Sequence, residues 1–181
     1  RKVKRIPDVI KIFYKIQQEI PAKLMMVGDG PEKEKAEYLC KELGILDKVI
    51  FFGNSNEIDK ILSYTDLFLL PSETESFGLA ALEAMAWSVP VISSKSGGLS
   101  EVNFDGISGY LSDVGNTDEM AANALKILSD EETLLKFKEN ALSVAKKFDI
   151  INILPLYVEL YQKAIKKYSK KNKFLREAKK E

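Results

Sequence analysis

Compact apolar runs alternate along this chain with longer stretches whose apolar residues recur every three or four positions. A compact apolar run is typical of a strand buried on both faces, and the longer period is typical of a helix with one apolar side. When the two patterns alternate along a chain, a parallel sheet with helices on its two faces buries both. The sequence therefore predicts an α/β fold built on a parallel sheet.

The boundaries of the predicted elements follow from the turn-forming residues between them. Strands are expected over residues 22–27, 49–52, 66–70, 89–92 and 109–111. Helices are expected over residues 7–20, 32–43, 58–64, 78–87, 117–128 and 131–147. A last helix starts near residue 150, with Pro155 near its first turn or at a kink. We expect residues 1–149 to form one domain and residues 150–181 to form a separate helix and tail.

Charge and composition exclude several classes of function. Lysine plus arginine and aspartate plus glutamate both number 27, so a whole-chain attraction to nucleic acid is excluded. The chain has no histidine, which excludes a Ser-His-Asp triad and a histidine-bound metal. Cys40 is the only cysteine, so neither an internal disulfide nor a thiolate metal site can form. The amphipathic pattern around Cys40 predicts a core position.

The two ends of the chain give further expectations. The chain opens with Arg1 rather than methionine, and we expect residue 1 to lie inside a longer protein. It shows no signal peptide and no apolar run of about 18 to 20 residues, so the cytoplasm is the default location. From Ala164 to Glu181, eight lysines and arginines stand against two glutamates. This tail favours a solvated helix end over contact with a membrane surface or a partner.

The loop after the strand expected at residues 66–70 carries the most specific chemical pattern. Ligands of parallel sheets bind at the carboxyl ends of the strands. Here Gly78 opens a helix whose first N–H groups have no partner within the helix, which suits a phosphate. Glu75 in the loop and Glu83, one to two turns into the helix, suit hydrogen bonds from sugar hydroxyls. Glutamates that merely stabilise a helix start remain the alternative on spacing alone.

The residues around this loop resemble a known family. Glu75-Ser-Phe-Gly-Leu-Ala-Ala-Leu-Glu83-Ala-Met-Ala is similar to the Glu-x7-Glu signature of the retaining glycosyltransferases of family four, which have the GT-B fold. Further segments resemble family landmarks in family order: residues 1–5, 27–31, 52–53, 89–92, 97–102 and 106–111. The resemblance covers residues 1–161. It implies a Rossmann-like domain, the C-terminal half of a GT-B protein, which binds a nucleotide sugar.

The resemblance also implies roles for single residues of the loop and helix. Glu75 would hold hydroxyls of the donor sugar, and it is assigned to binding rather than to nucleophilic attack. Glu83 would bind the ribose hydroxyls. The other contacts to the sugar and the diphosphate would come from Ser76, Phe77, Gly78 and Leu79.

The basic opening and two other loops complete the implied site. Arg1, together with Lys4 or Arg5, would neutralise the diphosphate and stabilise the leaving UDP. Which of Lys4 and Arg5 matches the family's second basic residue stays open. The base and the phosphates would pack near Gly28, Gly53 and Asn54. In the front-face path of the family, these residues supply orientation and electrostatics rather than acid–base chemistry.

The resemblance implies a site without metal or cofactor, since the UDP-sugar is a substrate and the sequence contains no Asp-x-Asp. The chain departs from the family at three positions, one of which is Ser100, where many relatives carry proline. Ser88 stands where relatives often carry glycine, and Trp87 stands where they carry a small residue. We expect Trp87 to find space against a neighbouring helix.

A narrower resemblance concerns the substrates. The basic opening and Ser72–Leu79 are similar to a bacterial subfamily that transfers N-acetylglucosamine from UDP to L-malate in bacillithiol biosynthesis. The acceptor would bind to an N-terminal domain outside this chain, so we expect the isolated chain to be inactive. The last helix would cross back to that domain, and a homodimer through its apolar residues is compatible with the sequence.

Two other functions stay open. One is a transferase of the same family with another sugar or acceptor, such as a glycolipid or polysaccharide. The other is a non-catalytic nucleotide-sugar-binding domain. UDP-N-acetylglucosamine 2-epimerases share the fold, but they lack the signature that is present here.

Overall fold

A computed structural model of the protein describes the backbone of residues 2–177 and the side chains of residues 2–168. Arg1, predicted to contact a diphosphate, therefore lies outside the described residues. The chain divides into two units, Arg1–Ala145 and Lys146–Glu181. The first unit holds all the described strands and the predicted site residues.

The described strands are all paired in parallel, and they form two sheets rather than the single sheet that the sequence predicts. One sheet consists of β1 (Leu24–Val27) and β2 (Val49–Gly53). The other has the order β3 (Phe68–Leu70), β4 (Val91–Ser94) and β5 (Gly109–Ser112). In the first sheet Leu24 pairs with Val49. In the second, Val91 lies between Phe68 and Gly109. Apolar runs identify strands but not which edges pair, which explains the difference.

The helices confirm the predicted alternation. They are α1 (Ile6–Glu19), α2 (Lys33–Glu42), α3 (Ile58–Ser63), α4 (Leu79–Ala86), α5 (Leu99–Val102), α6 (Thr117–Leu128), α7 (Glu131–Lys147) and α8 (Ile150–Glu177). The 3-10 helices η1 (Lys2–Lys4) and η2 (Leu46–Lys48) and the four-residue α5 were not predicted, because each is too short to show a period.

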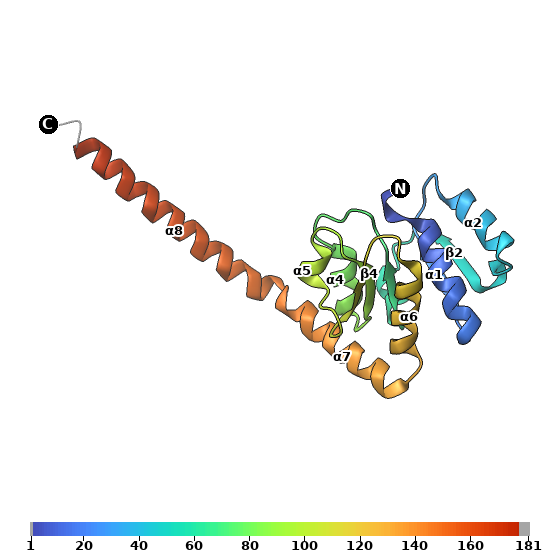
Figure 1. Cartoon of the computed structure of the whole chain (residues 1–181). Helices are drawn as coiled ribbons and strands as arrows, with labels where there is room; N and C mark the ends of the chain where they lie inside the picture. Colours follow the sequence, from blue (N-terminus) through green and yellow to red (C-terminus); the bar gives the residue numbers. More distant parts are fainter. Residues whose placement is uncertain (1, 178–181) are drawn as a thin grey trace. The chain divides into compact units, whose positions relative to one another are not determined.

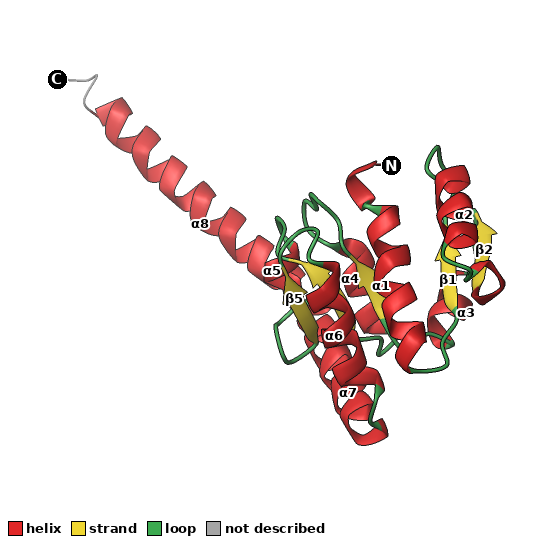
Figure 2. Cartoon of the chain, turned by 45° about the vertical axis from the view of Figure 1, so that its right-hand side comes forward, coloured by secondary structure: helices red, strands yellow, loops and turns green. Residues whose placement is uncertain are grey.

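Helix α1 packs against both sheets (Figure 2). Its Ile12 and Ile16 share a buried cluster with Ile92 of β4 and with residues of α6. Its Ile10 and Phe13 belong to a second cluster, beside β1, β2 and α2. Helix α4 packs against β3 and β4. The result is the predicted α/β, Rossmann-like arrangement of parallel strands with helices on both faces (Figure 1).

Two single-residue predictions about packing are confirmed. Cys40 is fully buried in the cluster beside β1 and β2. This burial, followed by the nearby charge of Glu37, raises the pKa of the Cys40 thiol. The indole Nε1 of Trp87 donates a hydrogen bond of 3.2 Å to Asp59 Oδ1, so this side chain lies against the neighbouring helix α3, with 44% of the residue exposed.

The second unit contains α8. Pro155 lies inside this helix, which continues past it. The apolar side chains of Leu156, Val158 and Leu160 are exposed. Among the described residues, no helix combines the length and the apolar character that a membrane crossing would need.

Candidate functional site

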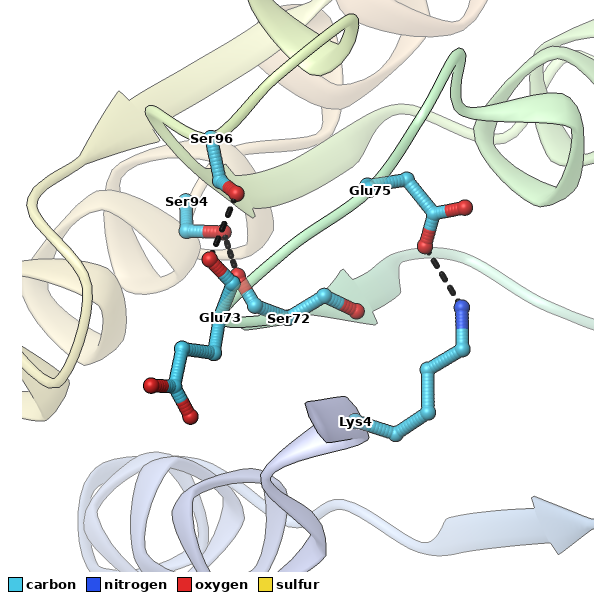
Figure 3. Close-up of polar contacts among 6 residues, drawn as sticks. All are labelled: Lys4, Ser72, Glu73, Glu75, Ser94 and Ser96. Atoms are coloured by element: carbon cyan, nitrogen blue, oxygen red, sulfur yellow. Dashed lines mark hydrogen bonds and ion pairs between the residues drawn. The ribbon is translucent and has the colours of Figure 1, made fainter. Parts of the chain in front are cut away.

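The loop between β3 and α4 is held by hydrogen bonds from two directions. From the N-terminal side, Val3 O accepts a hydrogen bond of 2.8 Å from Glu73 N. From the segment after β4, Ser94 Oγ donates to Ser72 O, and Ser96 Oγ donates to Glu73 O at 2.7 Å (Figure 3). These bonds fix the backbone of a segment that has no regular secondary structure of its own.

Gly97 and Gly98 complete this support because they allow a close approach of backbones. Gly98 N donates a hydrogen bond of 3.0 Å to Glu75 O. A Cβ atom on Gly97 would lie 2.0 Å from the same Glu75 oxygen, and one on Gly98 would lie 2.6 Å from Phe77 Cα. Only glycine fits at these two positions. The loop that carries Glu75 is therefore set by the loop that follows β4.

Lys4 lies beside the predicted sugar-binding carboxylate. Its Nζ is 2.5 Å from Glu75 Oε2 (Figure 3), with 38% of the Lys4 side chain and 18% of the Glu75 side chain exposed. Arg5 has a different partner, because its Nε lies 2.5 Å from Asp8 Oδ2. Of the two basic residues, Lys4 is the one whose side chain reaches the loop.

The start of α4 offers backbone donors next to this ion pair. Gly78 is the N-cap residue, with φ of 97°, and no side chain caps the helix. Within the described part of the chain, the N–H groups of Leu79 and Ala80 have no hydrogen-bond acceptor. The side chains of Phe77 and Leu79 are exposed. Such donors, at the positive end of a helix dipole, favour an anion.

Glu83 is the fifth residue of α4, and its side chain is exposed. Together with Lys4 and Val27 it lines a groove of about 840 Å³. Lys4 therefore borders both the loop with Glu75 and the groove with Glu83. This arrangement brings a cation and two carboxylates to the region where β1 and β3 end.

The remaining predicted residues lie at the carboxyl edge of the β1–β2 sheet. Gly28 N donates a hydrogen bond of 2.7 Å to Gly53 O, which joins the ends of the two strands. Asn54 follows directly and is exposed. Val27, next to Gly28, lines the groove that Lys4 and Glu83 also line.

No role was predicted for the serines that support the loop. Ser72 is fully buried, and its Oγ has no hydrogen-bond partner among the described residues. Its hydroxyl is directed away from Ser94 and Ser96 (Figure 3). The signal in the sequence is Ser93-Ser94-Lys95-Ser96, a polar run directly after an apolar strand. Among residues 2–168, whose side chains the structure describes, no group of three or more cysteine or acidic side chains could hold a metal ion.

Comparison with known proteins identifies the family of the chain. The profile of the family described as glycosyl transferases group 1 matches residues 1–144. The N-acetyl-alpha-D-glucosaminyl L-malate synthase of Bacillus anthracis is 45% identical over 162 residues, which is 89% of this chain and 42% of that protein. A crystal structure of Anabaena HepE in complex with UDP covers 90% of this chain and 46% of its own, with 25% identity and a TM-score of 0.82.

A complex of the same Anabaena protein with UDP-glucose has a TM-score of 0.80, with 25% identity over 90% of this chain and 46% of its own. The chain thus spans less than half the length of these relatives. The family profile covers most of the chain, and the parallel sheets agree with the solved structures. This chain belongs to the glycosyltransferase group 1 family.

Proposed function

We propose that this chain is the donor-binding half of a retaining glycosyltransferase that moves N-acetylglucosamine from UDP to a hydroxyl of L-malate. The observation that carries the proposal is the position of Lys4 against Glu75, beside the uncapped start of α4. Support for the donor class comes from the complexes of the Anabaena relative with UDP and UDP-glucose. Support for the sugar and the acceptor comes from the relative that is 45% identical.

The diphosphate would bind between Lys4 and the start of α4. The leaving UDP gains negative charge as the bond to the sugar breaks, so fixed positive groups stabilise the transition state more than the ground state. The N–H groups of Leu79 and Ala80 and the Lys4 ammonium supply such groups. An ammonium has three donors, so Lys4 can keep its bond to Glu75 and still donate to a phosphate oxygen. Arg1 would add a second cation.

The two glutamates would accept hydrogen bonds from hydroxyls. Glu75 would hold the donor sugar, with the backbone of residues 76–79 beside it, and Glu83 would hold the ribose. Gly28, Gly53 and Asn54 would border the base. In a front-face path the acceptor proton passes to the leaving phosphate oxygen, so no residue of this chain acts as a nucleophile. The reaction would need neither metal nor cofactor.

The test uses the longer protein that contains this chain, with UDP-N-acetylglucosamine and L-malate. We expect UDP and N-acetylglucosaminyl-malate to form together, with an α-configured product in the NMR spectrum. UDP binding without malate-dependent product would keep the donor assignment and overturn the acceptor, and other acceptor classes would then be screened. Failure to bind UDP would overturn the donor assignment.

A mutation tests whether Glu83 belongs to the nucleotide site. Glu83→Ala removes a carboxylate that would accept from the ribose, and a hydrogen bond to a charged group contributes about 1.5–3 kcal/mol. We therefore expect UDP affinity to fall by roughly 10- to 150-fold. Glu139→Ala, on the exposed side of α7, is the matched control and should leave affinity unchanged. Equal effects of both variants would contradict the assignment.

A further inference from the structure

Arg5 joins the segment that reaches the loop between β3 and α4 to helix α1. Its φ and ψ angles are 50° and 49°, so this residue lies in the left-handed region. A side chain is disfavoured there because its Cβ crowds the following carbonyl oxygen, which lowers the population of this conformation by roughly 5- to 30-fold. Among the described residues, Arg5 and Ser88 are the only non-glycine residues with a positive φ. Such a conformation persists only where other contacts hold it.

Hydrogen bonds on both sides of Arg5 make this residue a corner of the backbone. Arg5 N donates a hydrogen bond of 3.0 Å to Lys2 O, which closes the 3-10 helix η1. Arg5 O accepts a hydrogen bond of 2.8 Å from Asp8 N in the first turn of α1. The backbone angles of Arg5 therefore set the direction in which η1 leaves α1.

That direction decides whether η1 meets the loop between β3 and α4. Val3 O accepts a hydrogen bond of 2.8 Å from Glu73 N, and Lys4 Nζ lies 2.5 Å from Glu75 Oε2 (Figure 3). Both contacts come from residues that precede the corner. A right-handed or extended Arg5 would turn η1 in another direction, and both contacts would be lost. The position of the Lys4 ammonium therefore requires the left-handed conformation of Arg5.

The side chain of Arg5 supplies the contacts that hold the corner. Its Nε lies 2.5 Å from Oδ2 of Asp8, which is buried in the first turn of α1. Among the described residues, Arg5 is the only cation within ion-pair distance of this carboxylate. Gly115, which follows β5, lies against the same guanidinium, since a Cβ atom added there would be 3.1 Å from Arg5 Nη2. The guanidinium is therefore held by α1 and by the turn after β5.

We propose that Arg5 is a positioning residue, which the Asp8 carboxylate locks in the left-handed conformation so that Lys4 lies beside Glu75 and the start of α4. Arg5 itself does not touch the nucleotide. The inference rests on the proposed function, because it takes the Lys4 ammonium as a contact to the diphosphate of the donor. Without the lock, only a fraction of the molecules has Lys4 in place, and the apparent affinity for the nucleotide is reduced by that fraction.

Calorimetric titration of the longer protein with UDP tests the proposal, with the Tm measured in parallel. Asp8→Ala removes the lock and keeps the cationic side chain of Arg5. We expect UDP affinity to fall by roughly 5- to 30-fold, the factor by which an unlocked side chain disfavours the left-handed conformation. If Arg5 bound the phosphates directly, its release from Asp8 would leave the affinity equal or raise it, and that outcome would overturn the proposal.

Two substitutions of Arg5 separate the backbone conformation from the charge. Arg5→Ala keeps the preference against positive φ and should lower UDP affinity as much as Asp8→Ala does. Arg5→Gly also removes the guanidinium, but glycine takes positive φ about as readily as negative φ, so affinity should stay within about threefold of the native value. The Tm should fall in both variants, since each leaves a buried carboxylate without its cation. Equal losses of affinity in the alanine and glycine variants would contradict a positioning role.

A rescue and a coupling measurement show whether the effect passes through Lys4. Adding Arg5→Gly to Asp8→Ala should restore UDP affinity to within about threefold of the native value. Asp8→Ala should cause no further loss of affinity in the Lys4→Met variant, because substitutions that act through one contact are not additive. A full further loss in that variant would overturn this inference alone.

The control is Asp118→Ala, which breaks the ion pair between α6 and Lys15 of α1. This variant also loses a carboxylate that pairs with a residue of α1, and its UDP affinity should be unchanged. An equal loss in Asp118→Ala and Asp8→Ala would assign the effect to the packing of α1 in general and overturn the inference. Failure of the native protein to bind UDP would overturn the proposed function, and this inference with it.

Discussion

Lys4 Nζ lies 2.5 Å from Glu75 Oε2, so a side chain from the first helical turn of the described chain meets the loop that opens α4. Residues 71 positions apart in the sequence form this pair. The pair is partly exposed, and exposed ion pairs contribute only about 0–1 kcal/mol to stability. Its importance therefore lies in what it positions, which is a cation beside uncapped backbone donors.

Replacing Lys4 with methionine should separate the contribution of Lys4 to stability from its contribution to nucleotide binding. Lys4→Met keeps the aliphatic length and removes the charge. In the longer protein we expect UDP affinity, measured by calorimetry, to fall by roughly 10- to 150-fold, because a charged hydrogen bond contributes about 1.5–3 kcal/mol. The free energy of unfolding should change by less than about 1 kcal/mol.

Lys15→Met is the matched control. Lys15 Nζ also lies 2.6 Å from a carboxylate, that of Asp118, and 34% of its side chain is exposed. It belongs to α1 and pairs with α6, and it does not line the groove. UDP affinity should be unaffected in this variant. A loss as large as that in Lys4→Met would indicate a general charge effect.

The second prediction concerns the glycine that lies against the loop. In Gly97→Ala the new Cβ would lie 2.0 Å from Glu75 O, and backbone cannot yield as a flexible side chain can. Such overpacking costs about 1–3 kcal/mol and displaces the loop. We expect both a lower Tm and a loss of UDP binding of at least about tenfold, comparable to the loss of a contact to a charged group.

Gly106→Ala supplies the comparison, because the two glycines have similar positive φ values, 51° at Gly97 and 68° at Gly106. A Cβ on Gly106 would meet only the Tyr110 ring, at 4.0 Å. Its backbone strain should lower the Tm without changing UDP affinity. If Gly97→Ala behaves in the same way, then the contact with Glu75 O does not position the site.

The sequence predicted the longer helices and the strands because each of these elements has a local signal. The helical spacing of apolar residues in α7 and the turn-forming residues around β2 locate these two elements without any tertiary information. Strand β4 was predicted at residues 89–92 and instead spans Val91–Ser94. Pro90 has no N–H for a sheet, and its carbonyl accepts a hydrogen bond from Phe68 N. Ser93 and Ser94 extend the strand although they are polar.

Within the candidate site, contacts between distant segments could not be read from the sequence. The motif places Glu75 and Glu83 on one loop and helix, and that is a local property. That Lys4 rather than Arg5 reaches Glu75 depends on Arg5 pairing with Asp8, which the spacing alone leaves open. Apolar runs in the sequence also do not show which strand edges pair, so the absence of pairing between β1 and β3 could not be predicted.

Cys40 gives a prediction on pH. Its pKa is raised in the folded state, so the unfolded state loses the thiol proton at a lower pH than the folded state does. Stability from this group is therefore complete below the ordinary thiol pKa, about 8.5, and is lost as the pH rises through the folded value. Urea unfolding between pH 7 and 10 should show a steeper loss for the native protein than for Cys40→Ala. Equal slopes would mean that the Cys40 thiol does not contribute to the pH dependence of stability.

The last prediction concerns the end of α4, where Ser88 stands in the left-handed region with φ of 61°. Val89 N donates to Ala84 O and Ser88 N donates to Met85 O, the pattern in which this position is usually glycine. The left-handed conformation costs a residue with a side chain about 1–2 kcal/mol. Glycine loses more backbone entropy on folding, about 0.5–1 kcal/mol. We therefore expect Ser88→Gly to stabilise the protein by about 0.5–1 kcal/mol and to raise the Tm by about 1–4 °C.

The end of α2 provides the reciprocal experiment. Gly44, with φ of 67°, occupies the same position, since Ile45 N donates to Cys40 O and Gly44 N donates to Lys41 O. A Cβ atom on Gly44 would meet no atom within 4 Å, so Gly44→Ser adds backbone strain without a clash. It should lower the Tm by about the amount that Ser88→Gly raises it, and the double variant should lie near the original value, because the two sites share no partners. Scanning calorimetry of the four proteins measures both effects. A fall in Tm for Ser88→Gly would show that the serine side chain contributes more than its backbone conformation costs.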